Sequence, residues 1–204
     1  MNDQPRTLLQ IAGAPLHPSP LDRSALVLID HQLEYVTGAI PLNGIREAAA
    51  EAARLLGLAR EHGVPVFHIV HHGRPGGPAF DPQGPHVAIM PEVAPRDGET
   101  VVVKSLPNAF AGTDLHALIQ ASGRKELIIA GFATHMCVSA TTRAALDLGY
   151  RSTIVAGATA TRDLPHPSGK GVVPAGTIHE AALAALADRF AVIVPDAAAL
   201  AKGC

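Results

Sequence analysis

The sequence predicts a single α/β domain with a three-layer arrangement, in which helices cover a mainly parallel central sheet. Two observations lead to this prediction: short apolar, β-branched runs recur along the chain, and helical patterns separate them. Parallel strands need long crossover connections, which such helices supply. Neither an internal repeat nor a domain boundary is visible, so we treat residues 1–20 as an N-terminal leader and 21–204 as one domain.

The first half of the domain contains three predicted strands, separated by one helix and one long loop. Asn43 is the expected cap of the helix and Gly63 its expected stop. The loop is rich in proline and glycine, and loops of this length inside compact domains are usually functional or mobile. In order, the elements are a strand ending at Asp30, the helix over 43–63, a strand over 64–70, the loop over 71–99 and a strand ending at Lys104.

The second half alternates helices and strands with one further loop. This loop, residues 162–176, is expected to lie within the domain rather than to link two domains. The predicted elements are a helix within 112–123, a strand over 125–131, a helix over about 135–148, a strand over 151–157, the loop, a helix over 177–190 and a strand over 191–195.

Composition disfavours several classes of function. The formal net charge is −2 and aromatic residues make up 3% of the chain, so neither a basic stripe nor a base-stacking surface is expected, and nucleic-acid binding is disfavoured. No apolar run approaches the about 20 residues that span a bilayer. The first residues lack a secretory signal pattern, which predicts a cytoplasmic protein. Cys137 and Cys204 are the two cysteines, and they predict free thiols rather than a disulfide framework.

Three chemically reactive residues fall at or just past the ends of predicted strands: Asp30, Lys104 and Cys137. In an open α/β sheet, ligands bind outside the carboxyl ends of the strands. Taken singly, each residue has a simpler explanation, because an aspartate forms turns, a lysine is solvated and a cysteine packs as a small apolar residue. Their shared position at one sheet edge predicts a functional site.

These three residue types suit nucleophilic catalysis. A free thiol has a pKa of about 8.5, and a nearby ammonium and a helix N-terminus both favour its thiolate. A carboxylate can accept the thiol proton and return it to a leaving amine. Cys137 lies about one turn into its predicted helix, where backbone N–H groups are free to face a developing negative charge. Thr134 could cap this helix, and it is also a candidate substrate contact.

Three segments resemble the isochorismatase-like cysteine hydrolases, a family that includes nicotinamidases and N-carbamoylsarcosine amidohydrolases. The segments are ALVLIDHQ around Asp30, VVVKSLPNAF around Lys104 and GFATHMCVSATTRAALDLGY around Cys137, and the resemblance extends over about residues 23–195. It implies a six-stranded parallel sheet with helices on both faces, assembled as a homodimer or homotetramer. The implied activity is hydrolysis of a C–N bond in a small amide, lactam or carbamoyl compound.

The resemblance also implies roles for individual residues. Asp30 would be the general base and acid, Lys104 the cation that polarises the thiol, and Cys137 the nucleophile that forms a thioester intermediate. A non-proline cis peptide bond would fall at Phe132–Ala133. The backbone amides of Ala133 and Cys137 would form the oxyanion hole.

The chain departs from two members of the family. Nicotinamidases carry an Asp-x-His motif followed by a further histidine, whereas Ile69 and Val70 precede His71 and His72 by two positions here. Adjacent histidines point in different directions and do not easily share a metal. We therefore expect neither a metal nor another cofactor. Isochorismatases of the siderophore type lack the nucleophilic cysteine, so Cys137 favours amide hydrolysis.

Residues that bind the substrate are harder to predict, and each candidate has a structural alternative. Glu34 could favour a cationic substrate, and His71 or His72 could line the pocket. His135 is expected to point away from Cys137 and receives no catalytic role. The candidate contacts are Glu34, His71, Phe110 and Thr134, with Phe80 as a further apolar wall. Two other functions remain open: a redox-sensing thiol protein and a ligand-binding scaffold that has lost its activity.

Overall fold

A six-stranded, fully parallel sheet forms the centre of the protein in a computed structural model that describes residues 4–201. The strand order β3-β2-β1-β4-β5-β8 places the first strand in the interior, between β2 and β4. This arrangement confirms the predicted fold class. The strands are β1 (Ser24–Ile29), β2 (Val66–His71), β3 (Thr100–Lys104), β4 (Glu126–Phe132), β5 (Arg151–Ala160) and β8 (Val192–Val194).

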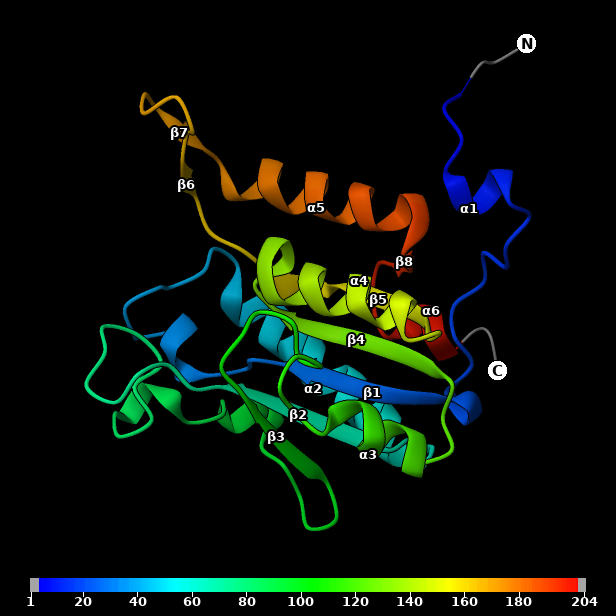
Figure 1. Ribbon diagram of the computed structural model, residues 1–204, viewed down its shortest axis with the longest axis horizontal. Helices are drawn as coiled ribbons and strands as arrows, with labels where there is room; N and C mark the ends of the chain where they lie inside the picture. The colour runs from blue at the N-terminus through cyan, green and yellow to red at the C-terminus, as the bar shows by residue number, and fades with distance from the viewer. Residues whose placement is uncertain (1–3, 202–204) are drawn as a thin grey trace.

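Helices cover both faces of the sheet (Figure 1). Alternation along β4 shows the division: Leu127 and Ile129 belong to one apolar core, whereas Ile128 and Ala130 belong to the other. The first core also holds apolar residues of α3 (Leu115–Ala121), α4 (Ser139–Asp147) and α5 (Ala175–Arg189). The second holds those of α2 (Ile45–Glu61) and α6 (Ala198–Ala201).

The structure differs from the predicted elements at several boundaries. Asn43 does not cap α2: Gly44, with φ +68°, occupies the cap position, and the amide of Asn43 donates to the carbonyl of Thr161 at 2.9 Å. Gly63, with φ +61°, follows the helix as predicted. β5 continues to Ala160, three residues beyond its predicted end.

Two further elements were not predicted. The loop over 162–176 contains a projecting antiparallel hairpin made of β6 (Leu164–Pro165) and β7 (Val172–Val173) (Figure 1). The leader contains a single helical turn, α1 (Leu8–Ile11), whose first amide donates to Asp188 of α5 at 2.8 Å. Residues 1–3 and Cys204 lie outside the described residues.

The long loop between β2 and β3 is irregular, as predicted, apart from the short turns η3 (Pro85–Val87) and η4 (Pro91–Val93). Two backbone hydrogen bonds attach it to the segment that leaves β1: Leu33 N to Ala88 O at 2.9 Å and Met90 N to His31 O at 2.8 Å. It therefore lies at the carboxyl edge of the sheet. Two other short turns are η1 (Leu21–Arg23) and η2 (Leu33–Tyr35).

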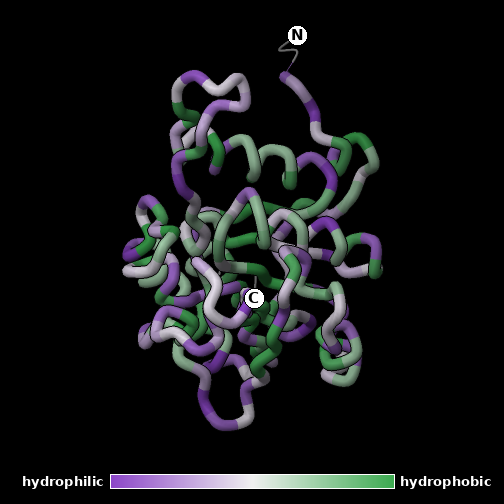
Figure 2. Tube along the Cα trace, turned by 60° about the vertical axis from the view of Figure 1, so that its left-hand side comes forward, coloured by the Kyte–Doolittle hydropathy of each residue, from purple (hydrophilic) through white to green (hydrophobic). Residues whose placement is uncertain are grey.

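Hydrophobic residues gather along the central strands, and the projecting loops are more hydrophilic (Figure 2). No helix within residues 4–201 combines the length and apolar character needed to cross a membrane.

Candidate active site

Asp30, Lys104 and Cys137 meet at the carboxyl edge of the sheet. Asp30 directly follows β1, Lys104 ends β3, and Cys137 lies in the turn η5 (Thr134–Val138), just after β4. The Lys104 Nζ atom lies 2.7 Å from Asp30 Oδ2 and donates to Cys137 Sγ at 3.4 Å. The three side chains that the strand-end argument grouped are therefore in mutual contact, because the parallel strands β1, β3 and β4 all end at this edge.

A fourth side chain completes the surroundings of the ammonium. His71, the last residue of β2, has its Nδ1 atom 3.1 Å from Lys104 Nζ. An ammonium has three N–H donors and no acceptor. Asp30, Cys137 and His71 thus give the buried Lys104 one partner for each donor.

The backbone around Asp30 takes an unusual conformation. Asp30 has φ +53°, in the left-handed region that few residues other than glycine adopt. Its amide donates to the carbonyl of Ile69 at 2.9 Å, which fixes it against β2. Such conformations persist where the surrounding structure holds them, and they cluster at functional sites.

Gly131 allows β1 and β4 to approach each other closely at this edge. It has φ +135°, and a Cβ atom built on it would lie 2.1 Å from the carbonyl oxygen of Ile29. No other residue fits this contact without moving the strands apart. The pairing of β4 with β5 also shifts register between Ile129 and Gly131.

The turn that carries Cys137 begins with a cis peptide bond between Phe132 and Ala133. It continues as a π-helical turn, and its last residue precedes α4. The carbonyl of Ala133 accepts hydrogen bonds from Met136 N at 2.9 Å and Val138 N at 3.3 Å, the amides on either side of Cys137. Amides in the first turn of a helix lack intrahelical partners, so this turn can present N–H groups to an anion.

Burial controls the ionisation of the site. It raises the pKa of the Cys137 thiol to about 12, an effect that the negative charge of Asp30 increases and Lys104 opposes. It also raises the pKa of Asp30 to about 6, against the opposing effects of Lys104 and the thiol. At neutral pH the resting site therefore holds a thiol beside a carboxylate, rather than the thiolate expected from sequence.

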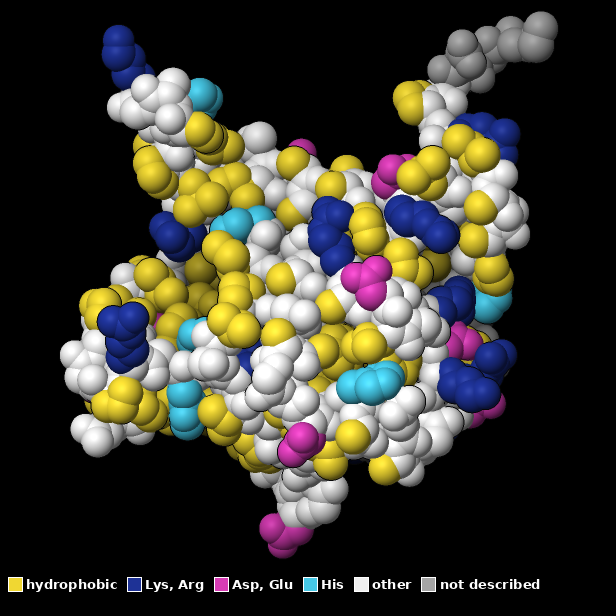
Figure 3. All heavy atoms as spheres, in the orientation of Figure 1, with side chains coloured by type: hydrophobic (Ala, Val, Ile, Leu, Met, Phe, Trp, Pro, Cys, Tyr) yellow, Lys and Arg dark blue, Asp and Glu magenta, His cyan; other side chains and the backbone are white. Residues whose placement is uncertain are grey.

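Cys137 lines a cavity of about 260 Å³. Hydrophobic side chains line a recess at this side of the molecule, below the projecting hairpin (Figure 3). The walls are mostly apolar and include one guanidinium. They are formed by Tyr35, Ile40, Leu42, His71, Phe80, Pro107, Ala133, His135, Met136, Cys137 and Arg162.

Three of the predicted substrate contacts are not among these wall residues, and their side chains have other partners. Glu34 is buried and accepts hydrogen bonds from the amides of Ala39 at 2.6 Å and Phe80 at 2.9 Å. Phe110 stacks on Tyr150, with ring centroids 5.9 Å apart.

The third is Thr134, which is fully buried. Its hydroxyl donates to the carbonyl of Ala160 and lies 3.0 Å from His179 Nδ1. It makes no capping hydrogen bond to the helix that it begins, so the predicted cap was wrong.

The three histidines considered as candidates differ in whether they line the cavity. His71 lines the cavity, as expected, whereas His72 does not. His135 also lines it. Its Nδ1 atom lies 2.6 Å from the hydroxyl of Thr161, and burial lowers its pKa. This hydrogen bond gives His135 a structural partner.

Several wall residues were not predicted at all, and Arg162 is the most important of them because it is a charged group in an apolar wall. A usable signal was present: Arg162 follows β5, the neighbour of β4, and parallel strands end at the same edge. Placing the end of β5 at 157 moved Arg162 into the following loop and concealed this relationship. Tyr35, Ile40, Leu42, Pro107 and Met136 were missed because they lie on loops or turns.

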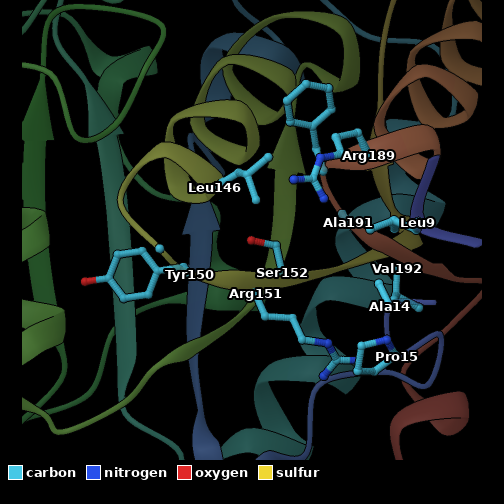
Figure 4. Close-up of a pocket in the computed structure, with 12 residues that line it drawn as sticks. Leu9, Ala14, Pro15, Leu146, Tyr150, Arg151, Ser152, Arg189, Ala191 and Val192 are labelled. Atoms are coloured by element: carbon cyan, nitrogen blue, oxygen red, sulfur yellow. The ribbon is translucent and has the colours of Figure 1, made fainter. Parts of the chain in front are cut away.

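A second cavity of about 260 Å³ lies at the amino edge of the sheet, between the N-terminal leader and the start of β5 (Figure 4). The leader contributes Leu9, Ala14 and Pro15 to its wall, and the sheet side contributes Tyr150 and Ser152. It contains no member of the Asp30, Lys104 and Cys137 cluster, so the candidate catalytic residues lie at the first cavity. Within residues 4–201, no three histidine, cysteine or acidic side chains are placed to hold a metal ion.

Comparison with known proteins gives consistent results. The isochorismatase domain model matches residues 24–198. The uncharacterized isochorismatase family protein YddQ of Bacillus subtilis is 40% identical over 173 residues, which cover 83% of this chain and 94% of that protein. Maleamate amidohydrolase of Pseudomonas putida is 32% identical over 151 residues, 65% of this chain and 70% of that protein. The crystal structure of an isochorismatase from Pseudomonas putida KT2440 superposes with a TM-score of 0.90 at 43% identity and covers 97% of this chain and 100% of its own.

Proposed function

The chain belongs to the isochorismatase family, and from this premise we propose that it is a cysteine hydrolase that cleaves the C–N bond of a small amide, lactam or carbamoyl compound. One observation carries the proposal. A single buried ammonium contacts both a carboxylate and a thiol, and the thiol lies in the wall of a cavity large enough for a small molecule.

The first half of the reaction acylates Cys137. As the Cys137 sulfur attacks the substrate carbonyl carbon, Asp30 accepts the thiol proton. The positive charge of Lys104 stabilises the negative charge that moves from the Asp30 carboxylate to the sulfur. The backbone amides of Ala133 and Cys137 donate to the oxyanion of the tetrahedral intermediate. When the intermediate collapses, the C–N bond breaks, and Asp30 delivers its proton to the departing nitrogen. The products of this half are a thioester on Cys137 and free ammonia or amine.

The second half hydrolyses the thioester. Asp30, again a carboxylate, accepts a proton from water while the water oxygen attacks the thioester carbonyl. The same two amides stabilise the second oxyanion, and its collapse breaks the C–S bond. The proton on Asp30 returns to the sulfur of Cys137. One amide and one water thus give one acid and one amine, and the enzyme regains its resting form.

The cavity wall favours a particular kind of acyl group. Most of the wall is apolar, which suits a short hydrocarbon chain. Arg162 adds one half-buried guanidinium, whose hydrogen bond is a long one of 3.5 Å to the carbonyl of Asp163. Glu34 binds backbone amides instead of facing the cavity, so the carboxylate that was expected to bind a cationic substrate is engaged elsewhere. We propose a neutral or anionic amide, and the similarity to a maleamate amidohydrolase supports this choice.

A substrate panel with a nucleophile variant tests the function. The panel contains half-amides of short dicarboxylic acids, neutral short-chain amides, carbamoyl compounds, a lactam and isochorismate, and the assay follows release of ammonia, amine or pyruvate. Cys137→Ala should lose turnover of the amide substrate while keeping its circular dichroism spectrum and Tm. Rapid quenching of the wild-type enzyme should reveal a peptide containing Cys137 with the mass of the acyl group added.

Other outcomes separate the alternatives. An alanine variant with full activity would exclude covalent catalysis by Cys137. Turnover confined to isochorismate would place the enzyme among vinyl-ether hydrolases instead. Reversible oxidation of Cys137 that changes the oligomeric state, with no hydrolysis of any compound, would favour a redox-sensing protein.

The assembly and location remain predictions. We propose a homodimer or homotetramer in the cytoplasm, and light scattering at several protein concentrations checks the assembly.

A further inference from the structure

We propose that His71 is a positioning residue that holds the ammonium of Lys104 against Asp30 and Cys137. This inference deepens the proposed function, because it concerns the same site. His71 was predicted as a substrate contact, and the structure gives its Nδ1 atom a different partner, Lys104.

The contact between His71 and Lys104 is built into the sheet. The two residues are paired in register at the ends of the neighbouring parallel strands β2 and β3. Lys104 Nζ lies 3.1 Å from His71 Nδ1, 2.7 Å from Asp30 Oδ2 and 3.4 Å from Cys137 Sγ. A buried ammonium without one of its partners is costly, and it would turn to recover a hydrogen bond. His71 is the acceptor that leaves the other two N–H groups directed at the reacting residues.

This contact requires a neutral imidazole with a fixed tautomer. Because an ammonium can only donate, Nδ1 must carry the lone pair and Nε2 the proton. Burial, the charge of Lys104 and nearby His72 together lower the pKa of His71 to about 4, so the ring is neutral at physiological pH. The Nε2–H group remains available on a residue that also lines the cavity.

Gln32 holds the backbone of His71 in place. Its side-chain amide accepts from His71 N at 2.8 Å and donates to His71 O at 3.0 Å, and it also donates to Val87 O at 2.8 Å. Gln32 is fully buried and lies two residues after Asp30. The chain segment that supplies the carboxylate therefore also fixes the residue that orients the ammonium.

The histidine ring is fixed as well. It packs edge to face on Phe80, with ring centroids 4.9 Å apart at an angle of 69°. This second contact allows ring packing and hydrogen bonding to be separated by mutation. His71→Phe keeps an aromatic ring beside Phe80 and removes the acceptor. His71→Asn removes the ring and keeps an oxygen acceptor close to the position of Nδ1.

The test measures how fast iodoacetamide alkylates Cys137 at pH 7.5, using mass spectrometry of the peptide that contains it. This readout needs no substrate, so it is independent of whether the proposed amide hydrolysis is correct. His72→Phe is the matched control, since His72 is an adjacent half-buried histidine that does not line the cavity. Urea unfolding of every variant checks that the fold is intact, and His71→Leu replaces His71→Phe if the latter does not fold.

We expect His71→Phe to slow alkylation by about tenfold, the effect of losing one hydrogen bond to a charged group. His71→Asn should stay within about threefold of wild type on the same scale, and His72→Phe should match wild type. Where an amide substrate is available, His71→Phe should lower kcat by a similar factor and change KM less.

Two results would overturn the proposal. Alkylation of His71→Phe at the wild-type rate would show that Lys104 does not depend on the acceptor. Equal losses in His71→Asn and His71→Phe would assign the effect to the imidazole as a packing or substrate-binding group. Failure of the proposed function has a different signature: alkylation follows the expected ranking, and no amide is hydrolysed by any variant.

Discussion

The ammonium nitrogen of Lys104 lies 2.7 Å from a carboxylate oxygen of Asp30, and neither side chain has any exposed surface. Removing two charges from water is expensive, and their attraction recovers this cost only with good geometry. Such a pair is therefore better explained by the chemistry it enables than by stability. It keeps a carboxylate ionised next to a thiol in a largely apolar setting.

The first prediction concerns this ion pair. Lys104→Met should leave Asp30 as a buried, unpaired carboxylate and lower the free energy of unfolding by about 3–5 kcal/mol. The double variant Asp30→Asn with Lys104→Met removes both charges and should be more stable than Lys104→Met alone. Urea unfolding at pH 7.5 measures both. A double variant less stable than either single variant would show that the pair contributes net stability.

The second prediction is the pH dependence of activity. Burial raises the pKa of Asp30 to about 6, and only its carboxylate form can accept the thiol proton. We therefore expect kcat/KM to fall about tenfold for each pH unit below about 6. Initial rates between pH 4.5 and 8 check this. An acid limb near the ordinary aspartate pKa of about 4 would show that Asp30 is not the base.

The third prediction concerns Arg162, the cation in the cavity wall. Arg162→Gln should raise KM for a half-amide that carries a carboxylate by about tenfold or more, because a charge-assisted hydrogen bond is lost. It should change KM for a neutral amide of the same chain length much less. Arg74→Gln, at an exposed arginine of the long loop, is the control. Equal effects on the two substrates would contradict a role in charge recognition.

The fourth prediction concerns stability in acid. His31 is buried against Phe132, and neither of its ring nitrogens has a hydrogen-bond partner within residues 4–201. Burial, with a smaller effect from His68, lowers its pKa to about 3. An unfolded chain binds this proton below pH about 6.5, whereas the folded chain does so only near pH 3. The free energy of unfolding should therefore decrease as pH falls through this window.

The variant His31→Leu tests this cause. It should lose less stability than wild type between pH 7 and pH 5, measured as the urea midpoint at each pH. The exposed residue His166 supplies the control His166→Gln, which should follow wild type. Identical pH profiles for His31→Leu and wild type would assign the acid sensitivity to other groups, His71 among them.

The fifth prediction compares two glycines. Gly131→Ala places a methyl group 2.1 Å from the Ile29 carbonyl oxygen and should destabilise the protein by more than about 3 kcal/mol, since strands β1 and β4 must separate. Gly57 lies within α2, and a Cβ atom there would meet nothing within 4 Å. Gly57→Ala should raise stability by about 0.5–1 kcal/mol. Thermal unfolding of both variants checks the contrast.

The sequence was sufficient to predict the sheet and the central cluster, and the reason is geometric. Apolar periodicity identified the six strands, and parallel strands of one sheet must end at a common edge. Asp30, Lys104 and Cys137 were therefore expected at this one edge, whatever the conformation of the loops. Their ionisation was not predictable, because it depends on burial: the thiol pKa rises to about 12, whereas the helix N-terminus and ammonium alone suggested a lower value.

The cavity walls were predicted less well, because loop conformations decide them. Glu34 and Phe110 were expected to face the substrate, and instead one binds the amides of a turn and the other stacks on Tyr150. Arg162 was missed because β5 continues three residues beyond its apolar run. The contact between His71 and Lys104 was not predicted, because it depends on how β2 and β3 are paired in register.

The strand order also affects how the protein is made. β1 lies in the interior of the sheet, and one of its two neighbours, β4, begins about a hundred residues later. During synthesis, one edge of the apolar strand β1 therefore stays unpaired until β4 has been made. Exposed edges of this kind can pair with other chains. Cys137 directly follows that same partner strand, so assembly of the Asp30, Lys104 and Cys137 cluster coincides with pairing of the exposed edge. A ribosome-bound chain that ends before β4 would be inactive and prone to aggregation.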